Sequence, residues 1–376
     1  MSTKPMLMTD LKTLQLDVEV GVEPDFDFLG EEYRAFFNLK RGTVFQAPLW
    51  QASIHARLVP GLAARPYTVT IRTRADRRLL ALIPFVVQKP AGISILQPAD
   101  FGVCDYNAVV GDREVLETLA ADPSVIGRLD ALLGTAGVMM FRKARDDGFS
   151  PARLFRKTSA TPCDNAAYHI ETGPDFEVWQ RQRVNRKFTK ELGRLGRQVA
   201  RDFGAYEQRV LTDEQGIRDA FAFLRAVRKG RFEGDLLDDE LYAAFYLDFA
   251  IAGAKSGDAI TYVSTLDGKP VAVLLGVAYA DECHAVLIGA DTQRLGKYSL
   301  GMQLLYRIVK MRFDKGLHRF DLGLGNTGYK SMFRVEETTL HNYTVARSLA
   351  GAALSMVYHH AKPLKNFLRR LSPRLR

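Results

Sequence analysis

The sequence predicts an α/β (α+β) protein of two similar halves, each with a mixed, mainly antiparallel sheet flanked by helices. With 376 residues, the chain is long for a single hydrophobic core. A pair of apolar β-type runs occurs near residue 70 and again near residue 270, and amphipathic runs of helical length lie around each pair. We therefore expect an N-terminal domain at 20–160, a C-terminal domain at 165–346 and a basic tail at 347–376.

Composition indicates a globular protein in a reducing compartment. Hydrophobic residues make up 47% of the chain and charged residues 25%. The cysteines Cys104, Cys163 and Cys283 are far apart and odd in number, which argues against a disulfide framework and against a zinc cluster. The amino terminus has no long apolar run, and the apolar segment 348–358 is too short to span a bilayer. These features predict a cytoplasmic protein, with peripheral attachment to the inner membrane as an option.

The net charge of +9 is concentrated in two segments. Residues 181–201 carry eight Lys or Arg against one Glu, and residues 338–376 carry seven Lys or Arg and no acidic residue. The rest of the chain is therefore net negative, which favours local acidic partners and argues against a DNA-binding surface. Within 183–201 the cations fall on one face of a helix. That face is either a solvated surface or a docking site for an anionic polymer, a lipid-linked substrate or a membrane.

The first half contains a predicted hairpin and a polar loop. Residues 67–72 and 79–87 read as its two strands. Trp50 lies in an apolar helical run and is expected in the core. Asp105 and Tyr106 precede a short strand at 107–110, and spacing alone favours a turn with an Asp cap there.

The second half repeats this layout. Residues 260–266 and 270–278 flank an Asp-Gly turn and predict a second hairpin. The shared layout indicates an internal duplication. The segment 342–346 is expected to close the second sheet.

The segment 287–333 reads as strand, glycine-bearing turn, helix, strand and glycine-rich loop. Ser299 is the expected N-cap of its helix and Gly316 the expected stop. Gly296 and Gly301 bracket the helix start, where free N–H groups and the helix dipole can hold a phosphate.

Gln293 to Tyr298 resembles the Q/R-x-x-G-x-G/A pyrophosphate loop of GNAT acetyltransferases, with a departure at Tyr298, where that family has Gly or Ala. The longer order, from Tyr298-Ser299-x-Gly301 through Phe320-Asp321-x-Gly323 to Tyr329-Lys330-x-x-Phe333, is similar to the CelD-like (BioF2-like) branch, which tolerates another residue there. The resemblance implies two tandem GNAT-like domains of Fem-like architecture. It also implies acetyl-CoA as acyl donor, bound by Leu287, Gln293, Arg294, Gly296, Lys297, Tyr298, Ser299 and Gly301.

The resemblance also implies catalytic residues. Tyr329 and Lys330 follow a loop with three glycines and would sit at the edge of the active site, where the tyrosine could protonate the thiolate and the lysine hold a phosphate or acceptor group. Asp105 would face the cleft between the halves. If the strand at 287–289 splays from its neighbour, its N–H groups could polarise the thioester carbonyl. The histidines lack metal-ligand spacing, so no metal is expected.

These features predict an acyl-CoA-dependent N-acyltransferase that modifies an amino sugar in bacterial exopolysaccharide, of the holdfast type among others, or in its lipid-linked precursor. One alternative is a Fem-like transferase that uses aminoacyl-tRNA. Another is a non-catalytic regulator of polysaccharide synthesis, whose basic tail senses cyclic di-GMP or an anionic membrane. A frayed basic terminus is the plain alternative for the tail.

Overall fold

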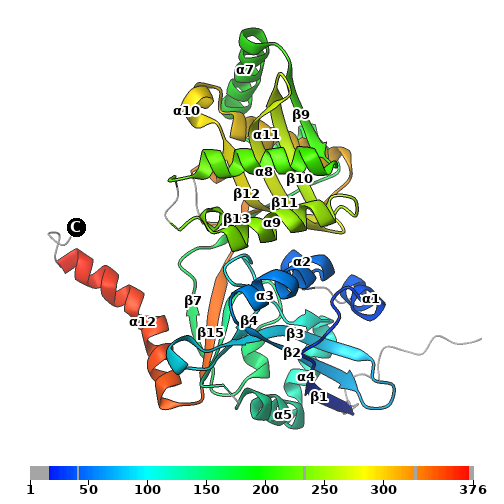
Figure 1. The fold of residues 1–376 in the computed structure, drawn as a ribbon, viewed down its shortest axis with the longest axis vertical. Helices are drawn as coiled ribbons and strands as arrows, with labels where there is room; N and C mark the ends of the chain where they lie inside the picture. Colours follow the sequence, from blue (N-terminus) through cyan, green and yellow to red (C-terminus); the bar gives the residue numbers. More distant parts are fainter. Residues whose placement is uncertain (1–16, 40–41, 135, 232–233, 326–327, 372–376) are drawn as a thin grey trace, which may run out of the picture.

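The structure is a computed structural model, and it describes residues 17–39, 42–134, 136–231, 234–325 and 328–371. Its two halves lie one above the other (Figure 1), and each is built on its own sheet. The mixed α/β architecture with two mainly antiparallel sheets flanked by helices confirms the predicted fold class.

The lower half in Figure 1 holds an eight-stranded sheet of order β1-β2-β3-β4-β6-β15-β7, with β5 paired to β3. Its strands are β1 Val18–Val22, β2 Arg65–Thr73, β3 Leu79–Gln88, β4 Ile95–Pro98, β5 Val110–Gly111, β6 Val138–Arg145, β7 Ser159–Pro162 and β15 Leu340–Ala346. Its helices are α1 Glu31–Leu39, α2 Pro48–Ser53, α3 Val59–Gly61, α4 Arg113–Ala121 and α5 Pro123–Leu133. Helix α1 begins at Glu31.

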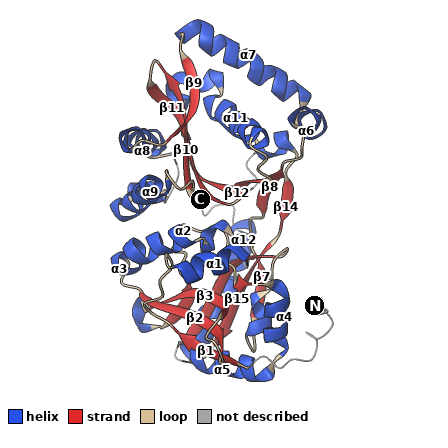
Figure 2. Cartoon of the chain, turned by 90° about the vertical axis from the view of Figure 1, so that its right-hand side faces the viewer, coloured by secondary structure: helices blue, strands red, loops and turns tan. Residues whose placement is uncertain are grey.

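The upper half holds a seven-stranded sheet of order β14-β8-β13-β12-β11-β10-β9. Its strands are β8 Ala167–Glu171, β9 Tyr206–Leu211, β10 Ala259–Leu266, β11 Lys269–Tyr279, β12 Glu282–Ala290, β13 Arg319–Leu324 and β14 Glu336–Thr338. Helices α8 Glu214–Arg228 and α9 Glu240–Gly253 cover one face, while α6 Phe176–Arg183, α7 Arg186–Phe203 and α11 Leu300–Asp314 cover the other (Figure 2). The short helix α10 Thr292–Leu295 and the 3-10 turn η6 Gly296–Tyr298 join β12 to α11.

The two sheets repeat one topology, in agreement with the predicted duplication. In each half, two antiparallel pairings are followed by a helical crossover to a parallel neighbour. These are β2-β3-β4 then β6 in the first half, and β10-β11-β12 then β13 in the second. The crossovers carry α4 and α5 in one case and α11 in the other. The two halves therefore share one order of strands and crossovers.

The prediction that 342–346 closes the second sheet is wrong. Strand β15 pairs with β6 and β7 in the first sheet, with Tyr343 opposite Phe141 and Ala160. The chain therefore crosses between the halves twice, after β7 and again after β14. A local hydrophobic pattern cannot reveal this, because a strand of the same composition fits either sheet.

A shared core joins the halves, and it contains Trp50 as predicted. Its ring is fully buried and lies 5.1 Å from that of Phe245 and 4.6 Å from that of Phe249, both on α9. Its indole Nε1–H donates to Cys104 Sγ at 3.2 Å. The loop that follows β4 is therefore fixed against both halves.

The C-terminal helix α12, Leu349–Leu371, packs on the first sheet. Buried His359 contacts Thr161 Oγ1 at 2.7 Å and Thr344 Oγ1 at 2.8 Å. The predicted basic tail residues Lys362, Lys365, Arg369, Arg370, Arg374 and Arg376 have side chains outside the described part of the structure. Among the described residues, no helix combines the length and the apolar content that crossing a bilayer would require.

Candidate functional site

The site lies where β12 and β13 part. The two strands pair in parallel at Glu282–His284 and Arg319–Asp321, and no further pairing between them occurs in the described residues. Strand β12 nevertheless continues to Ala290 along β11. At about 3.3 Å per residue, the opening beyond His284 is roughly 20 Å long. The splay that the sequence could only suggest is thus present, with one unpaired strand edge facing it.

A buried ionic cluster forms the closed end of this opening. His284 Nε2 donates to Asp105 Oδ2 at 2.8 Å, and His284 Nδ1 lies 3.3 Å from Asp321 Oδ1, an ion-pair distance. The same Asp321 oxygen accepts from the Tyr106 hydroxyl at 2.8 Å, and Arg145 Nη1 lies 3.4 Å from Asp321 Oδ2. The cluster therefore joins the loop after β4 and the end of β6 to strands β12 and β13.

The charges in this cluster depend on one another. Burial alone would lower the pKa of His284, but Asp321 and Asp105 outweigh it and raise the pKa to about 9. For the acidic Asp321, burial has the opposite effect and would raise the pKa. His284, the Gly323 N–H and Arg145 nevertheless hold the pKa of Asp321 well below its usual range. At neutral pH the cluster thus contains an imidazolium between two carboxylates. The Asp105 side chain is 29% exposed, so it is the member that a ligand can reach.

Gly323 makes this approach possible. It has a φ of +78°, and a Cβ there would lie 2.9 Å from Asp105 Oδ2. A side chain at this position would therefore push Asp105 away from the end of the opening.

Cations cap carbonyls on both walls of the opening. Lys330 is 1% exposed, and its Nζ donates to the carbonyls of Gly323 and Leu324 at 2.9 and 3.0 Å. Burial lowers the pKa of Lys330 to about 8, against the opposite effect of Asp321 and Asp105. On the other wall, Arg228 Nη1 donates to the Ile288 carbonyl at 2.7 Å, and its Nε donates to buried Asp235 at 2.8 Å. Both walls thus carry positive charge close to the splayed backbone.

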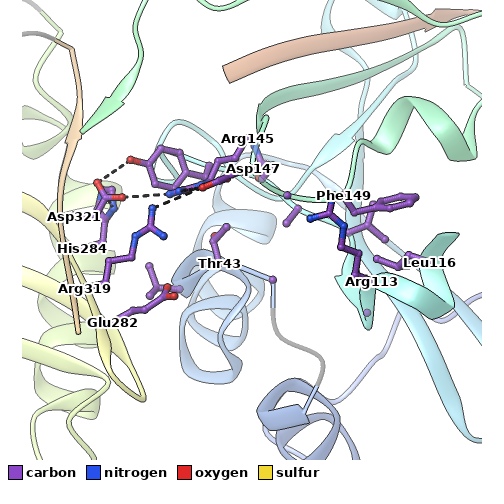
Figure 3. A pocket seen from close by; sticks show the side chains of 18 of the residues that line it. Thr43, Arg113, Leu116, Arg145, Asp147, Phe149, Glu282, His284, Arg319 and Asp321 are labelled. Atoms are coloured by element: carbon purple, nitrogen blue, oxygen red, sulfur yellow. Dashed lines mark hydrogen bonds and ion pairs between the residues drawn. The ribbon is translucent and has the colours of Figure 1, made fainter. Parts of the chain in front are cut away.

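A cavity of about 380 Å³ adjoins the closed end, between the two halves. Figure 3 shows Asp321, His284, Arg319 and Glu282 on one side of it, Arg113 and Phe149 on the other, and Arg145 and Asp147 between them. Its wall contains both hydrogen-bond donors and hydrogen-bond acceptors. Arg319 Nη2 is buried and has no hydrogen-bond partner among the described residues. Since buried donors are normally satisfied, the cavity is suited to a ligand with several oxygen atoms.

The predicted phosphate loop lies at the open end. Gln293, Arg294, Gly296 and Lys297 are exposed there, and a Cβ on Gly296 would meet only Thr292 Cβ, at 3.9 Å. The Tyr298 side chain is buried, and its hydroxyl donates to Asp202 Oδ2 at 2.7 Å. The family's glycine position is therefore filled by a side chain that points toward α7, and the exposed side of the loop stays accessible.

The start of α11 differs in part from the expectation. Ser299 precedes the helix but has left-handed backbone angles (φ 52°, ψ 45°), and its side chain makes no capping bond. The expected stop at Gly316 is confirmed by its φ of +65° just after the helix. Gly301 packs with its Cα against Ala290, since a Cβ would lie 3.5 Å from the Ala290 Cβ. The Leu287 side chain is buried in the shared core, which leaves only its backbone for a ligand.

The structure brings Asp105 and Lys330 to one end of the opening, because both lie beside Gly323: a Cβ there would lie 2.9 Å from Asp105 Oδ2, and Lys330 Nζ donates to its carbonyl at 2.9 Å. Tyr329 is half-buried and packs at the edge of the core of the second half. The sequence patterns did not point to His284 or Arg145, and they gave Asp321 no role in the site. The missing signal was the register that places His284 opposite Asp321. Among the described residues, no group of three or more His, Cys, Asp or Glu side chains could hold a metal ion.

Comparisons with known proteins agree with this geometry. Residues 186–331 match the family described as acetyltransferase (GNAT) domain. No curated protein matches the sequence. Among solved structures, "Crystal structure of FemX" has 11% identity and a TM-score of 0.59, with 88% of this chain and 98% of that chain covered.

Two further structures share the fold. "The structure of L-PGS from Bacillus licheniformis" has 13% identity and a TM-score of 0.53, over 90% of this chain and 96% of that one. A conserved protein of unknown function from Bacteroides thetaiotaomicron has 12% identity and a TM-score of 0.51, over 87% and 99%. At these identities the likeness concerns the fold alone. Residues 186–331 thus match a GNAT acetyltransferase domain, in a chain whose fold is similar to that of FemX.

Proposed function

We propose that the protein is an acyl-CoA-dependent N-acyltransferase that modifies an amino sugar of a bacterial exopolysaccharide or of its lipid-linked precursor. The observation that carries the proposal is the opening between β12 and β13. An exposed, glycine-bearing loop stands at one end of it, and the Asp105–His284–Asp321 cluster stands at the other. This arrangement separates a donor entrance from an acceptor side.

The loop fits the pyrophosphate of coenzyme A. Gly296 leaves space beside the exposed Arg294 and Lys297, and the start of the 15-residue helix α11 adds the positive end of its dipole. Acetyl-CoA would supply the acyl group and a thiolate leaving group. The unpaired edge of β12 offers backbone groups along which an extended pantetheine arm can lie. The cations Arg228 and Lys330 flank that path.

The residues at the closed end can manage the protons of the transfer. Asp105 accepts a proton as the amine nitrogen bonds to the thioester carbonyl carbon and the carbon–sulfur bond breaks. His284 donates to Asp105 and lies at ion-pair distance from Asp321, so the Asp105 carboxyl group is held in a fixed orientation. The Lys330 ammonium, with its pKa lowered to about 8, delivers a proton to the thiolate. The proton on Asp105 then returns through solvent to Lys330, which restores both groups.

The cavity between the halves is our proposed acceptor site. Its wall mixes arginines and carboxylates, among them Arg113, Arg319, Asp147 and Glu282, with the ring of Phe149. Hydroxyl-rich sugars need both donors and acceptors, and 380 Å³ is within the usual size of small-molecule sites. The amino group would reach Asp105 past Tyr106, which lines the cavity.

Coenzyme A binding tests the donor. The wild-type protein is expected to bind acetyl-CoA in calorimetry. Gly296→Glu is expected to weaken that binding by at least about tenfold, because it places a carboxylate beside the pyrophosphate. The added side chain meets open space, so folding is preserved. Gly173→Glu, at an exposed glycine elsewhere, serves as control and should bind as the wild type does. Absence of any acetyl-CoA binding would refute the proposal.

The pH dependence of turnover tests Lys330. Since burial lowers its pKa to about 8, the ammonium is present below that pH and is lost above it. With a saturating amine acceptor, kcat should fall as pH rises through about 8. In Lys330→Met, kcat should be about 100-fold lower and should not fall over this range. A wild-type kcat that keeps rising to pH 10 would exclude Lys330 as the proton donor.

A second candidate function is Fem-like transfer of an amino acid from charged tRNA. The fold likeness to FemX over 88% of this chain favours it. Transfer of a radiolabelled amino acid from tRNA, without acetyl-CoA, would distinguish it. We also propose that the C-terminal tail senses cyclic di-GMP or an anionic membrane. If the tail is responsible, deletion of residues 360–376 should abolish the binding of cyclic di-GMP or of anionic vesicles.

A further inference from the structure

The outer face of α7 presents one cation per helical turn. Lys187, Lys190, Arg194, Arg197 and Arg201 are all exposed along this 18-residue helix. Arg194 pairs with Glu191 and Arg201 with Asp202. Within the described residues, Lys190 and Arg197 have no ion pair with an acidic side chain. The helix lies at the end of the second half farthest from the first (Figure 1), and its cations are exposed, so no described segment covers this face.

A groove of about 490 Å³ runs between α7 and α11 beside this face. The exposed cations Lys190, Arg307 and Lys310 line it from both helices, together with Tyr306 and Gln208. Because cations on two helices surround one hollow, the groove concentrates positive potential more than a convex helix does.

Gly193 keeps this groove open. Glycine is unfavourable in a helix interior, and the packing gives no reason for it here, since a Cβ would meet only the flexible Arg197 Nη1 at 3.6 Å. Gly196 differs, because a Cβ there would lie 3.1 Å from Gln303 Oε1. A side chain at 193 would instead enter the groove, which Gly193 lines. An ordinary solvated helix face does not explain such a glycine.

We propose that the face formed by α7 and the outer side of α11 docks on an anionic lipid bilayer, with a phosphate headgroup in the groove between the helices. The stripe of cations from Lys187 to Arg201 is about 21 Å long, a size over which acidic lipids offer continuous negative charge. The stripe has no aromatic side chain between its cations, although stacking on aromatics is the usual means of holding single-stranded nucleic acid.

Docking in this way would orient the site. The C-terminal end of α7 holds the phosphate loop through the bond between Asp202 and Tyr298. The loop would therefore face the lipid surface, and the cavity between the halves would lie deeper toward the cell interior.

Co-sedimentation with vesicles tests the surface. The full chain should bind vesicles with about 30 mol% phosphatidylglycerol, should ignore pure phosphatidylcholine, and should lose binding at high salt. Lys190→Glu, Arg307→Glu and Lys310→Glu combined should weaken binding at least tenfold. The matched control combines Lys89→Glu, Lys255→Glu and Lys269→Glu, which reverse three exposed cations elsewhere and should have a much smaller effect.

Gly193→Leu tests the groove without a change in charge. It removes a helix-destabilising glycine, so the fold is expected to hold, and it should weaken vesicle binding severalfold by filling the groove. Unchanged vesicle binding by the triple variant would overturn the proposal and point to another surface, such as the C-terminal tail. Tighter binding of duplex RNA than of vesicles, through the same three cations, would overturn it as well. If Gly193→Leu binds as the wild type does, the headgroup assignment fails.

Discussion

Replacing Asp105 by asparagine is expected to lower kcat by about 100- to 1000-fold, the usual contribution of a positioned acid or base. The change preserves the shape of the side chain, and its amide oxygen can still accept from His284 Nε2. What it removes is the carboxylate that takes up the amine proton. Steady-state kinetics with acetyl-CoA and an amino-sugar acceptor measures the effect.

Donor binding separates a catalytic effect from a general one. Acetyl-CoA affinity should be the same in wild type and Asp105→Asn, because the phosphate loop lies at the other end of the opening. Asp175→Asn is the matched control, since Asp175 caps the exposed start of α6 and asparagine is an equally good cap. A kcat within threefold of wild type would remove Asp105 from the mechanism.

Asp321→Asn should lower the free energy of unfolding by about 3–5 kcal/mol, as is usual when one partner of a buried ion pair is removed. The Asp321 side chain is 7% exposed, and the neighbouring charges on His284 and Arg145 lose their shared counterion. Tyr106 and the Gly323 N–H can still donate to the amide oxygen, so the loss is mainly electrostatic. Urea denaturation followed by circular dichroism measures it.

A partly exposed ion pair provides the comparison. Asp130 pairs with Arg347, and their side chains are 25% and 20% exposed. Because such pairs contribute little, Asp130→Asn should cost no more than about 1 kcal/mol. Equal losses for Asp321→Asn and Asp130→Asn would mean that the cluster below the opening is not a special source of stability.

The sequence was sufficient for features that depend on short-range patterns. The hairpins at 67–87 and 260–278 follow from alternation and turn residues, and the stop at Gly316 follows from its conformational freedom. The phosphate loop could be predicted because its residues are contiguous, and it stays a prediction. The position of Tyr298 was not predictable, since a buried side chain that donates to Asp202 depends on how α7 crosses the loop.

The buried ionic cluster was largely hidden from sequence patterns because it is assembled from distant segments. His284 lies 179 positions from Asp105 in sequence, and Tyr106 lies 215 from Asp321. No spacing rule connects such residues. The strand β15 was placed in the wrong sheet for the same reason: its partners Phe141 and Ala160 lie in the first half.

The pairing of β15 with the first sheet has a consequence for the order in which the chain can fold during synthesis. The first sheet cannot be completed until residues 340–346 have left the ribosome, because that strand fills the place between β6 and β7. Pairings of such long range close slowly, since the entropy of a large loop is lost before they form. Until then, the first half keeps the edge of β6 unpaired. The two halves therefore reach their final arrangement together, after residues 340–346 have been synthesised.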